Sequence, residues 1–266
     1  MNRKQKGARF QRVPMRLVAP TVVTLLALCS GLTAMRMALE ERWDLAIAGI
    51  LVAAVLDGLD GRIARLLKGT SRFGAELDSL ADFVNFGVAP AIILYSWALD
   101  DVRSLGWIAA LLYAISGALR LARFNVAMDD PDRPAWSAKF FSGIPAPAGG
   151  LVVLLPIYLD RLGMNISGFS AAIAIYCLFV GFLMVSQLPS FSGKQFGMAI
   201  RRELVLPVFV SIVAAAALLA SYPYEVLSFA VTCYLISLPF AFSSFRAHLK
   251  RDKEQSEGTV ECVGVD

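Results

Sequence analysis

The charged residues divide the chain into long apolar windows. Windows without Asp, Glu, Lys or Arg run over residues 17–35, 45–56, 83–99, 104–119, 140–159, 162–193, 204–224 and 226–245. A spanning helix needs about 17–25 mostly apolar residues, and most of these windows are long enough. The window 45–56 is short, but its helical pattern continues to about residue 67. The pattern therefore predicts an all-α integral membrane protein with about eight transmembrane helices.

Lysines and arginines alternate between the two sides of this predicted topology. Of the 25 Lys and Arg residues, all but Arg36, Arg42, Arg103 and Arg161 fall on the side of the N-terminus. Because cytoplasmic loops of membrane proteins carry the excess of Lys and Arg, we expect both termini to be cytoplasmic. That orientation also requires an even number of spanning helices.

Composition supports the membrane class. The chain is 57% hydrophobic and only 17% charged, whereas a soluble domain carries about 25% charged residues. Cytoplasmic loops that face anionic lipid account for the net charge of +4, so no nucleic-acid partner is expected. We predict a basic cytoplasmic or interfacial arm over residues 1–16, a membrane domain over 17–246 and a polar cytoplasmic tail over 247–266.

Acidic residues gather where the second predicted helix meets the third. One set, at positions i, i+3, i+4, i+7 and i+8 of a helical face, comprises Asp57, Asp60, Gly61, Ala64 and Arg65. A second set, at positions i, i+4 and i+8, comprises Gly74, Asp78 and Asp82. A short turn with Ser71 as the predicted N-cap would make the two helices antiparallel neighbours. Their four carboxylates then converge at the cytoplasmic ends of helices 2 and 3, which is the predicted active site.

Four carboxylates in one apolar environment stay ionised only if cations neutralise them. Hard oxygen ligands suit Mg²⁺ or Mn²⁺, and two such ions about 3.5–4 Å apart are a common arrangement for phosphoryl displacement. The predicted metal ligands are Asp57, Asp60, Asp78 and Asp82. The chain's single histidine, His248, follows the last window, so histidine ligation and histidine catalysis are not expected within the membrane domain.

The pattern resembles the signature of the CDP-alcohol phosphotransferase family (class I CDP-alcohol phosphatidyltransferases). That signature reads D-x2-D-G-x2-A-R-x8-G-x3-D-x3-D and stands without departure from Asp57 to Asp82. The resemblance implies metal binding by Asp57, Asp60 and Asp78, with Asp82 shared between metal contact and catalytic base. It also implies a surface for the CDP group formed by Asp60, Gly61, Ala64, Arg65 and Gly74.

Two further stretches, 117–125 and 141–147, resemble bacterial membrane-spanning phosphatidylserine synthases of this family. Arg120 and Arg123 are predicted to contact substrate, the alternative being that they anchor the helix end in the cytoplasmic interface. Asn85 and Asn125 are further candidates for acceptor binding, with a helix-to-helix hydrogen bond as the alternative. The glycine and prolines of the second stretch are predicted to break the chain before the next helix.

The resemblance implies transfer of a phosphatidyl group from CDP-diacylglycerol to the hydroxyl of L-serine, giving phosphatidylserine and CMP. It also implies that the enzyme is a homodimer in the cell membrane. The nearest alternative is the same chemistry with glycerol 3-phosphate, inositol phosphate or choline as acceptor. A more distant one is a transporter, whose expected signature of broken helices in repeated halves is not found in the sequence.

Overall fold

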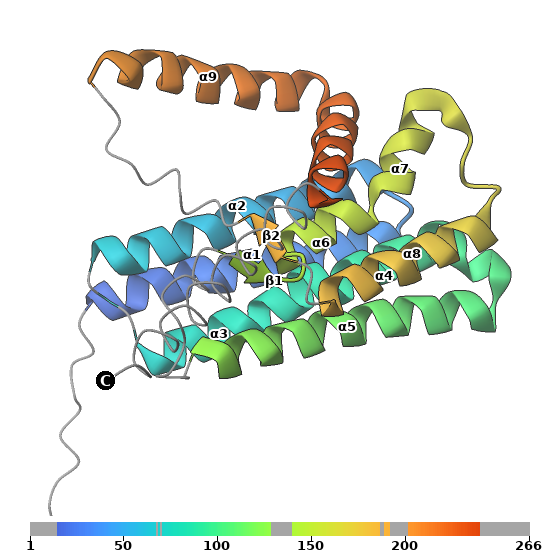
Figure 1. The fold of residues 1–266 in the computed structure, drawn as a ribbon, viewed down its shortest axis with the longest axis horizontal. Coiled ribbons are helices and arrows are strands. Elements are labelled where there is room, and N and C mark those ends of the chain that lie inside the picture. Colours follow the sequence, from blue (N-terminus) through green and yellow to red (C-terminus); the bar gives the residue numbers. More distant parts are fainter. Residues whose placement is uncertain are drawn as a thin grey trace, which may run out of the picture.

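The computed structural model describes residues 15–67, 69, 71–128, 140–186, 189–191 and 202–239, and these form a bundle of helices (Figure 1). The predicted tail 247–266 and nearly all of the predicted arm 1–16 lie outside the described residues. The first half of the bundle contains α1 (Met15–Leu39), α2 (Trp43–Leu66), α3 (Arg72–Asp82), η1 (Phe83–Val88), α4 (Ala89–Leu94), η2 (Tyr95–Leu99), η3 (Asp100–Val102) and α5 (Ser104–Met128). The second half contains β1 (Phe140–Ser142), α6 (Ala146–Val153), α7 (Leu155–Leu159), η5 (Asp160–Met164), α8 (Ser170–Val185), β2 (Pro189–Phe191), α9 (Arg202–Ser221) and a last helix over Pro223–Pro239.

All-α membrane architecture is confirmed in outline. Helices occupy each of the predicted apolar windows. Within the described residues, three helices are long and apolar enough to cross a membrane, namely Val18–Leu39, Arg72–Val102 and Ser104–Ala127. Counting each of two bent helix pairs as one span raises that number to five. A topology of eight spans therefore stays a prediction.

Small residues bring α1 close to its neighbours. A Cβ at Gly49 of α2 would lie 2.8 Å from the Cβ of Ala34, and the Ser30 hydroxyl donates to the Gly49 carbonyl at 2.7 Å. A Cβ at Gly31 would lie 2.1 Å from the Asn85 Oδ1 atom of η1. Close backbone approach through small residues is how helices pack where both surroundings and surfaces are apolar. The first contact holds α1 beside α2, and the second holds α1 beside η1.

The third helical rod runs from Arg72 to Val102 and contains two π-helical segments, η1 and η2. Such segments change which side chains face the neighbouring helices, and they are frequent at functional sites. The buried Tyr113 hydroxyl of α5 donates to the Phe86 carbonyl at 2.9 Å, which joins α5 to the first of these segments. The rod thus carries its acidic N-terminal part in a fixed orientation against α5.

The chain turns sharply before α6, as predicted. Gly143 has a φ of +78°, and a Cβ there would lie 2.5 Å from the Met184 carbonyl oxygen, so only glycine fits. Pro145 is the N-cap of α6, with Pro147 in its first turn, where a proline lacks no needed hydrogen bond. Beside this turn, β1 and β2 form a short antiparallel pair with Phe140 opposite Phe191. The predicted chain break is confirmed.

The last two helices form a bent pair at 118°, with Pro223 at the start of the second. In Figure 1, α9 is drawn away from the bundle and the last helix returns toward it. The Tyr224 hydroxyl donates to the Asp44 carboxylate of α2, and Arg161 lies 3.4 Å from the same carboxylate. The last helix is therefore tied to the end of α2 remote from the aspartate motif.

Candidate active site

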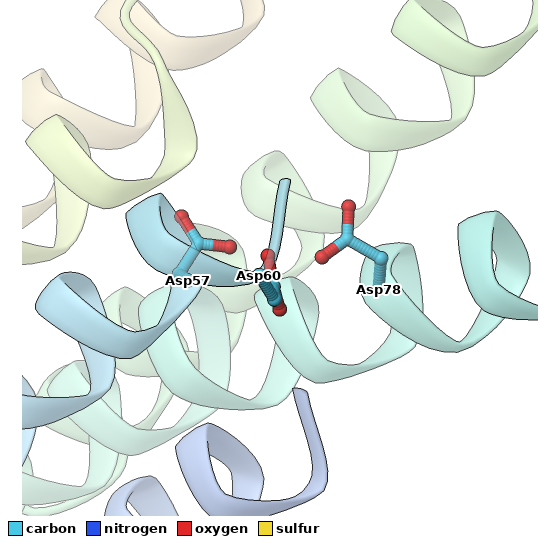
Figure 2. Close-up of side chains that lie close together, drawn as sticks. All are labelled: Asp57, Asp60 and Asp78. Carbon is cyan, nitrogen blue, oxygen red and sulfur yellow. The ribbon is translucent and has the colours of Figure 1, made fainter. Parts of the chain in front are cut away.

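Three of the predicted metal ligands meet between α2 and α3. Asp57 and Asp60 come from α2 and Asp78 from α3, and Asp60 lies between the other two in Figure 2. One carboxylate oxygen from each can be chosen so that all three lie within 4.8 Å of one another. Asp60 is buried, while Asp57 and Asp78 are half-buried. The convergence predicted from the helical spacing is confirmed for these three residues.

Local sequence explains this convergence. The Ser71 hydroxyl accepts a hydrogen bond from the Gly74 backbone N–H at 2.9 Å. Ser71 is therefore the N-cap of α3, as predicted. Since α2 ends at Leu66, only a short turn separates the two helices. On the open side of α2, a Cβ at Gly61 would meet no described atom within 4 Å. A ligand can therefore approach the backbone beside the carboxylates.

A pocket of about 190 Å³ opens next to Asp60 and Asp78. Four of the five residues predicted to bind the CDP group line it, namely Asp60, Gly61, Ala64 and Gly74. Arg65 is not among its lining residues; its Nε donates to the Gly61 carbonyl at 3.0 Å and its side chain is exposed. The lining consists of Pro20, Thr21, Thr24, Asp60, Gly61, Ala64, Gly69, Ser71, Gly74, Ala75 and Asp78.

Helix α1 contributes a wall of this pocket that the sequence motif does not predict. Pro20, Thr21 and Thr24 line it, and the Thr24 hydroxyl donates to Asp60 Oδ2 at 2.7 Å. Thr24 and Asp60 are 36 positions apart in the sequence. A spacing of three between two threonines on an apolar helix is a common pattern, so no signal in the sequence marked them as part of the site.

Asp82, the predicted base, lies one turn beyond Asp78 and close to Asp57. Neighbouring carboxyl groups share either a proton or a cation, because two bare carboxylates repel. Arg120 of α5 lies within electrostatic range of Asp82. The fourth aspartate of the motif thus adjoins the cluster on the side of α5.

Arg120 and Arg123 have different surroundings, although both were predicted to contact the acceptor. Arg120 is 8% exposed, lies 5.6 Å above the Phe124 ring, and its Nε has no hydrogen-bond partner among the described residues. Arg123 donates from Nη1 to the Val185 carbonyl at 2.8 Å and is exposed. The structure therefore brings Arg120 toward the aspartates and uses Arg123 to join α5 to the end of α8.

The two candidate asparagines also differ. Asn125 donates to the Ser79 hydroxyl at 3.0 Å, which is the helix-to-helix hydrogen bond given above as the alternative. Asn85 is 1% exposed, and neither its Oδ1 nor its Nδ2 has a partner within the described part of the chain. A buried amide without partners is costly, so Asn85 is the stronger candidate for contact with a bound molecule. A role for either residue in acceptor binding stays a prediction.

The donor set fits a hard divalent cation. Its ligand atoms are all carboxylate oxygens, which Mg²⁺ and Mn²⁺ prefer. Among the described residues, no Lys or Arg forms an ion pair within 4.0 Å of Asp57, Asp60 or Asp78. Their charge is therefore left for a cation or a proton to balance.

Comparison with known proteins agrees with this geometry. The family model for CDP-alcohol phosphatidyltransferase matches residues 17–190, and the model CDP-alcohol phosphatidyltransferase 2 matches residues 203–239. The CDP-diacylglycerol--serine O-phosphatidyltransferase of Mycobacterium leprae is 41% identical over 241 residues, which is 90% of this chain and 79% of that protein.

Relatives with the same name also occur in Helicobacter pylori and Methanocaldococcus jannaschii. The protein of Helicobacter pylori (strain J99) is 33% identical over 218 residues, covering 82% of this chain and 87% of the relative. That of Methanocaldococcus jannaschii is 35% identical over 181 residues, covering 65% and 75%. With the aspartate motif assembled in three dimensions and most of its length matched, this chain belongs to the CDP-alcohol phosphatidyltransferase family.

Proposed function

We propose that this protein transfers the phosphatidyl group of CDP-diacylglycerol to the hydroxyl of L-serine, forming phosphatidylserine and CMP. The observation that carries the proposal is the convergence of Asp57, Asp60 and Asp78 beside a pocket lined by the rest of the family motif. Serine as the acceptor is supported by the names of the relatives, which share up to 41% identity over most of the chain.

We place the cytidine diphosphate group at the pocket between α1, α2 and α3. Gly61, Ala64 and Gly74 leave its walls free of large side chains, and Arg65 is exposed one turn from Gly61, where it can turn toward a phosphate. Two Mg²⁺ or Mn²⁺ ions held by Asp57, Asp60, Asp78 and Asp82 would neutralise the pyrophosphate and stabilise CMP as it leaves. The acyl chains remain in the bilayer.

On the acceptor side, we assign the catalytic base to Asp82. The serine oxygen attacks the phosphatidyl phosphorus, the bond from that phosphorus to the CMP oxygen breaks, and Asp82 takes the hydroxyl proton. Asp82 suits this role because it lies close to Asp57 in the cluster and within electrostatic range of Arg120. We further propose that Arg120 pairs with the carboxylate of serine and that Asn85 hydrogen-bonds to the acceptor.

The direct experiment is a product assay with the purified full-length protein. CDP-diacylglycerol and Mg²⁺ or Mn²⁺ are mixed with L-serine, glycerol 3-phosphate, inositol phosphate or choline in separate reactions. We expect CMP release and phosphatidylserine with serine alone, identified by mass spectrometry of the lipid. A different phospholipid would overturn serine as acceptor and leave the family chemistry standing, whereas no CMP release with any alcohol would overturn the enzymatic proposal.

We also propose that the chain spans the cell membrane eight times, with both termini and the active site on the cytoplasmic side. The alternating distribution of Lys and Arg supports this orientation.

We propose that the enzyme is a homodimer. An apolar groove of about 460 Å³ between the third rod and α5, lined by residues that include Phe83 and Trp107, offers a surface for a second copy. Chemical cross-linking in native membranes tests the dimer.

A further inference from the structure

Thr24 is a buried hydroxyl in contact with the aspartate cluster. It lies in α1, is 5% exposed, and its Oγ1 is 2.7 Å from Asp60 Oδ2 and 3.2 Å from the Pro20 carbonyl oxygen. The hydroxyl has one proton, and the carboxylate oxygen is both closer and charged. The stronger hydrogen bond therefore runs from Thr24 to Asp60.

We propose that Thr24 is a positioning residue that orients the Asp60 carboxylate for metal binding. Helix α1 would thereby contribute to the metal centre. The inference rests on the proposed metal role of Asp57, Asp60 and Asp78. Asp60 is only 4% exposed, so few water molecules can compete with Thr24 for its carboxylate. With Oδ2 held by Thr24, rotation of the carboxylate group is restricted, and its remaining coordination capacity is directed to the cluster.

Thr24 contacts the aspartate that is buried at the centre of the cluster. Groups that hydrogen-bond to metal ligands orient them, and their loss typically weakens metal affinity or activity by about 10–100-fold. Asp60 is the buried member of the cluster and lies between the other two in Figure 2. An error in its orientation would therefore disturb its geometry with both Asp57 and Asp78.

The same helix face also borders the nucleotide pocket. Thr21 and Thr24 line that pocket together with Asp60 and Asp78. The wall of the pocket and the support of the metal ligand are therefore parts of one helix. A shift of α1 would change the pocket and the carboxylate orientation together.

A purely structural role for Thr24 predicts something different. Threonines in apolar helices commonly bond back to the carbonyl four residues earlier, and the bond from Thr24 to Pro20 is of this kind. Thr33 of the same helix makes that bond to the Cys29 carbonyl at 2.7 Å, but it is exposed and donates to no carboxylate among the described residues. Thr33 is thus a matched control, since it shares the helix and the back-bond but not the contact with Asp60.

The test measures Mn²⁺ binding to detergent-purified full-length protein by electron paramagnetic resonance, with no substrate present. Thr24→Val keeps the shape of the side chain and removes its donor, and we expect it to raise the Mn²⁺ Kd by about 10–100-fold. Thr24→Ser keeps the hydroxyl and should retain most of the affinity. Thr33→Val should bind as the wild type does. If Thr24→Val does not elute as a folded species, Thr24→Ala gives the same comparison.

An unchanged Kd in Thr24→Val or Thr24→Ala would overturn the positioning role while leaving the metal centre in place. An equal loss in Thr24→Ser would also overturn it, because the hydroxyl would then not be the relevant group. If the wild type bound no Mn²⁺, both this inference and the proposed metal centre would fail. The wild-type titration therefore separates the two failures.

Discussion

At the scale of single residues, we expect the site to depend on carboxylates that neutral groups cannot replace. Asp57, Asp60 and Asp78 provide ligand atoms within 4.8 Å of one another. Asp57→Asn, Asp60→Asn and Asp78→Asn keep the shape but each remove one charge. Because a supporting residue alone is worth about 10–100-fold, we expect each ligand change to lower turnover by more than about 100-fold.

The measurement for these ligands is CMP release at low and at saturating Mn²⁺. Glu76→Gln is the matched control, since Glu76 lies exposed on the same helix as Asp78 and outside the cluster. It should keep wild-type turnover. EDTA should stop the wild-type enzyme, and Mg²⁺ or Mn²⁺ should restore it. Near-normal turnover of any one Asn variant at low metal would remove that residue from the ligand set.

Asp82 is assigned a different role from its neighbours, and a metal titration can distinguish them. A positioned base contributes about 10²–10⁴-fold in rate, so Asp82→Asn should lower kcat by that factor while substrate and metal still bind. If Asp82 is chiefly a ligand, excess Mn²⁺ should recover much of the rate. The decisive measurement is kcat at saturating metal, where recovery would exclude the base role.

Arg120 is the basic residue expected to recognise the acceptor. It is buried near Asp82, whereas Arg123 is exposed and bonded to the Val185 carbonyl. Since a hydrogen bond to a charged group contributes about 1.5–3 kcal/mol, Arg120→Ala should raise the KM for serine by about 10–100-fold. Arg123→Ala should raise it far less. Equal and small effects in the two variants would return Arg120 to the role of an interfacial anchor.

At the scale of helices, the site is held by close packing of α1 against the third rod. A Cβ at Gly31 would lie 2.1 Å from Asn85 Oδ1, a distance that no real contact shows. Because overpacking typically costs about 1–3 kcal/mol, Gly31→Ala should lower the melting temperature of the detergent-solubilised protein. Gly168→Ala should not, since a Cβ there meets no described atom within 4 Å.

A double-mutant cycle tests whether this contact is the cause. Asn85→Ala removes the amide that a Cβ at position 31 would meet. Residues in contact show interaction energies of about 0.5–3 kcal/mol, so Gly31→Ala should be less damaging in the Asn85→Ala background than alone. Additive effects of the two substitutions would mean that the destabilisation arises elsewhere along α1.

At the scale of the whole molecule, the topology decides which segments face the cytoplasm. The bias of Lys and Arg predicts that the ends of the chain are inside and that the turns near residues 101 and 163 are outside. Single cysteines at Gln5, Ser104, Met164 and Ser256, in a background without the four native cysteines, can be labelled with a membrane-impermeant maleimide in intact cells. Only the middle two should react. Labelling of the C-terminal position would exclude an even number of spans.

The sequence by itself determined the class of the protein and the helical faces on which its acidic residues lie. Uncharged windows predict spanning helices because unpaired charges are expensive in lipid, and helical periodicity places Asp57 and Asp60 on one face and Asp78 and Asp82 on another. Ser71 as N-cap and Gly143 at the chain break were also predictable, since each depends on a few adjacent residues. These features are local, so neighbouring positions in the chain are enough to define them.

Only the tertiary structure decided which distant side chains complete the site. The contact between Thr24 and Asp60 joins positions 36 apart, and the burial of Arg120 beside Asp82 depends on how α5 packs against the third rod. Likewise, Arg123 and Asn125 look equivalent to Arg120 and Asn85 in sequence, yet they bond to a helix end and to Ser79. Helix periodicity fixes the face on which a residue lies, but which neighbour that face meets depends on the packing of the whole bundle.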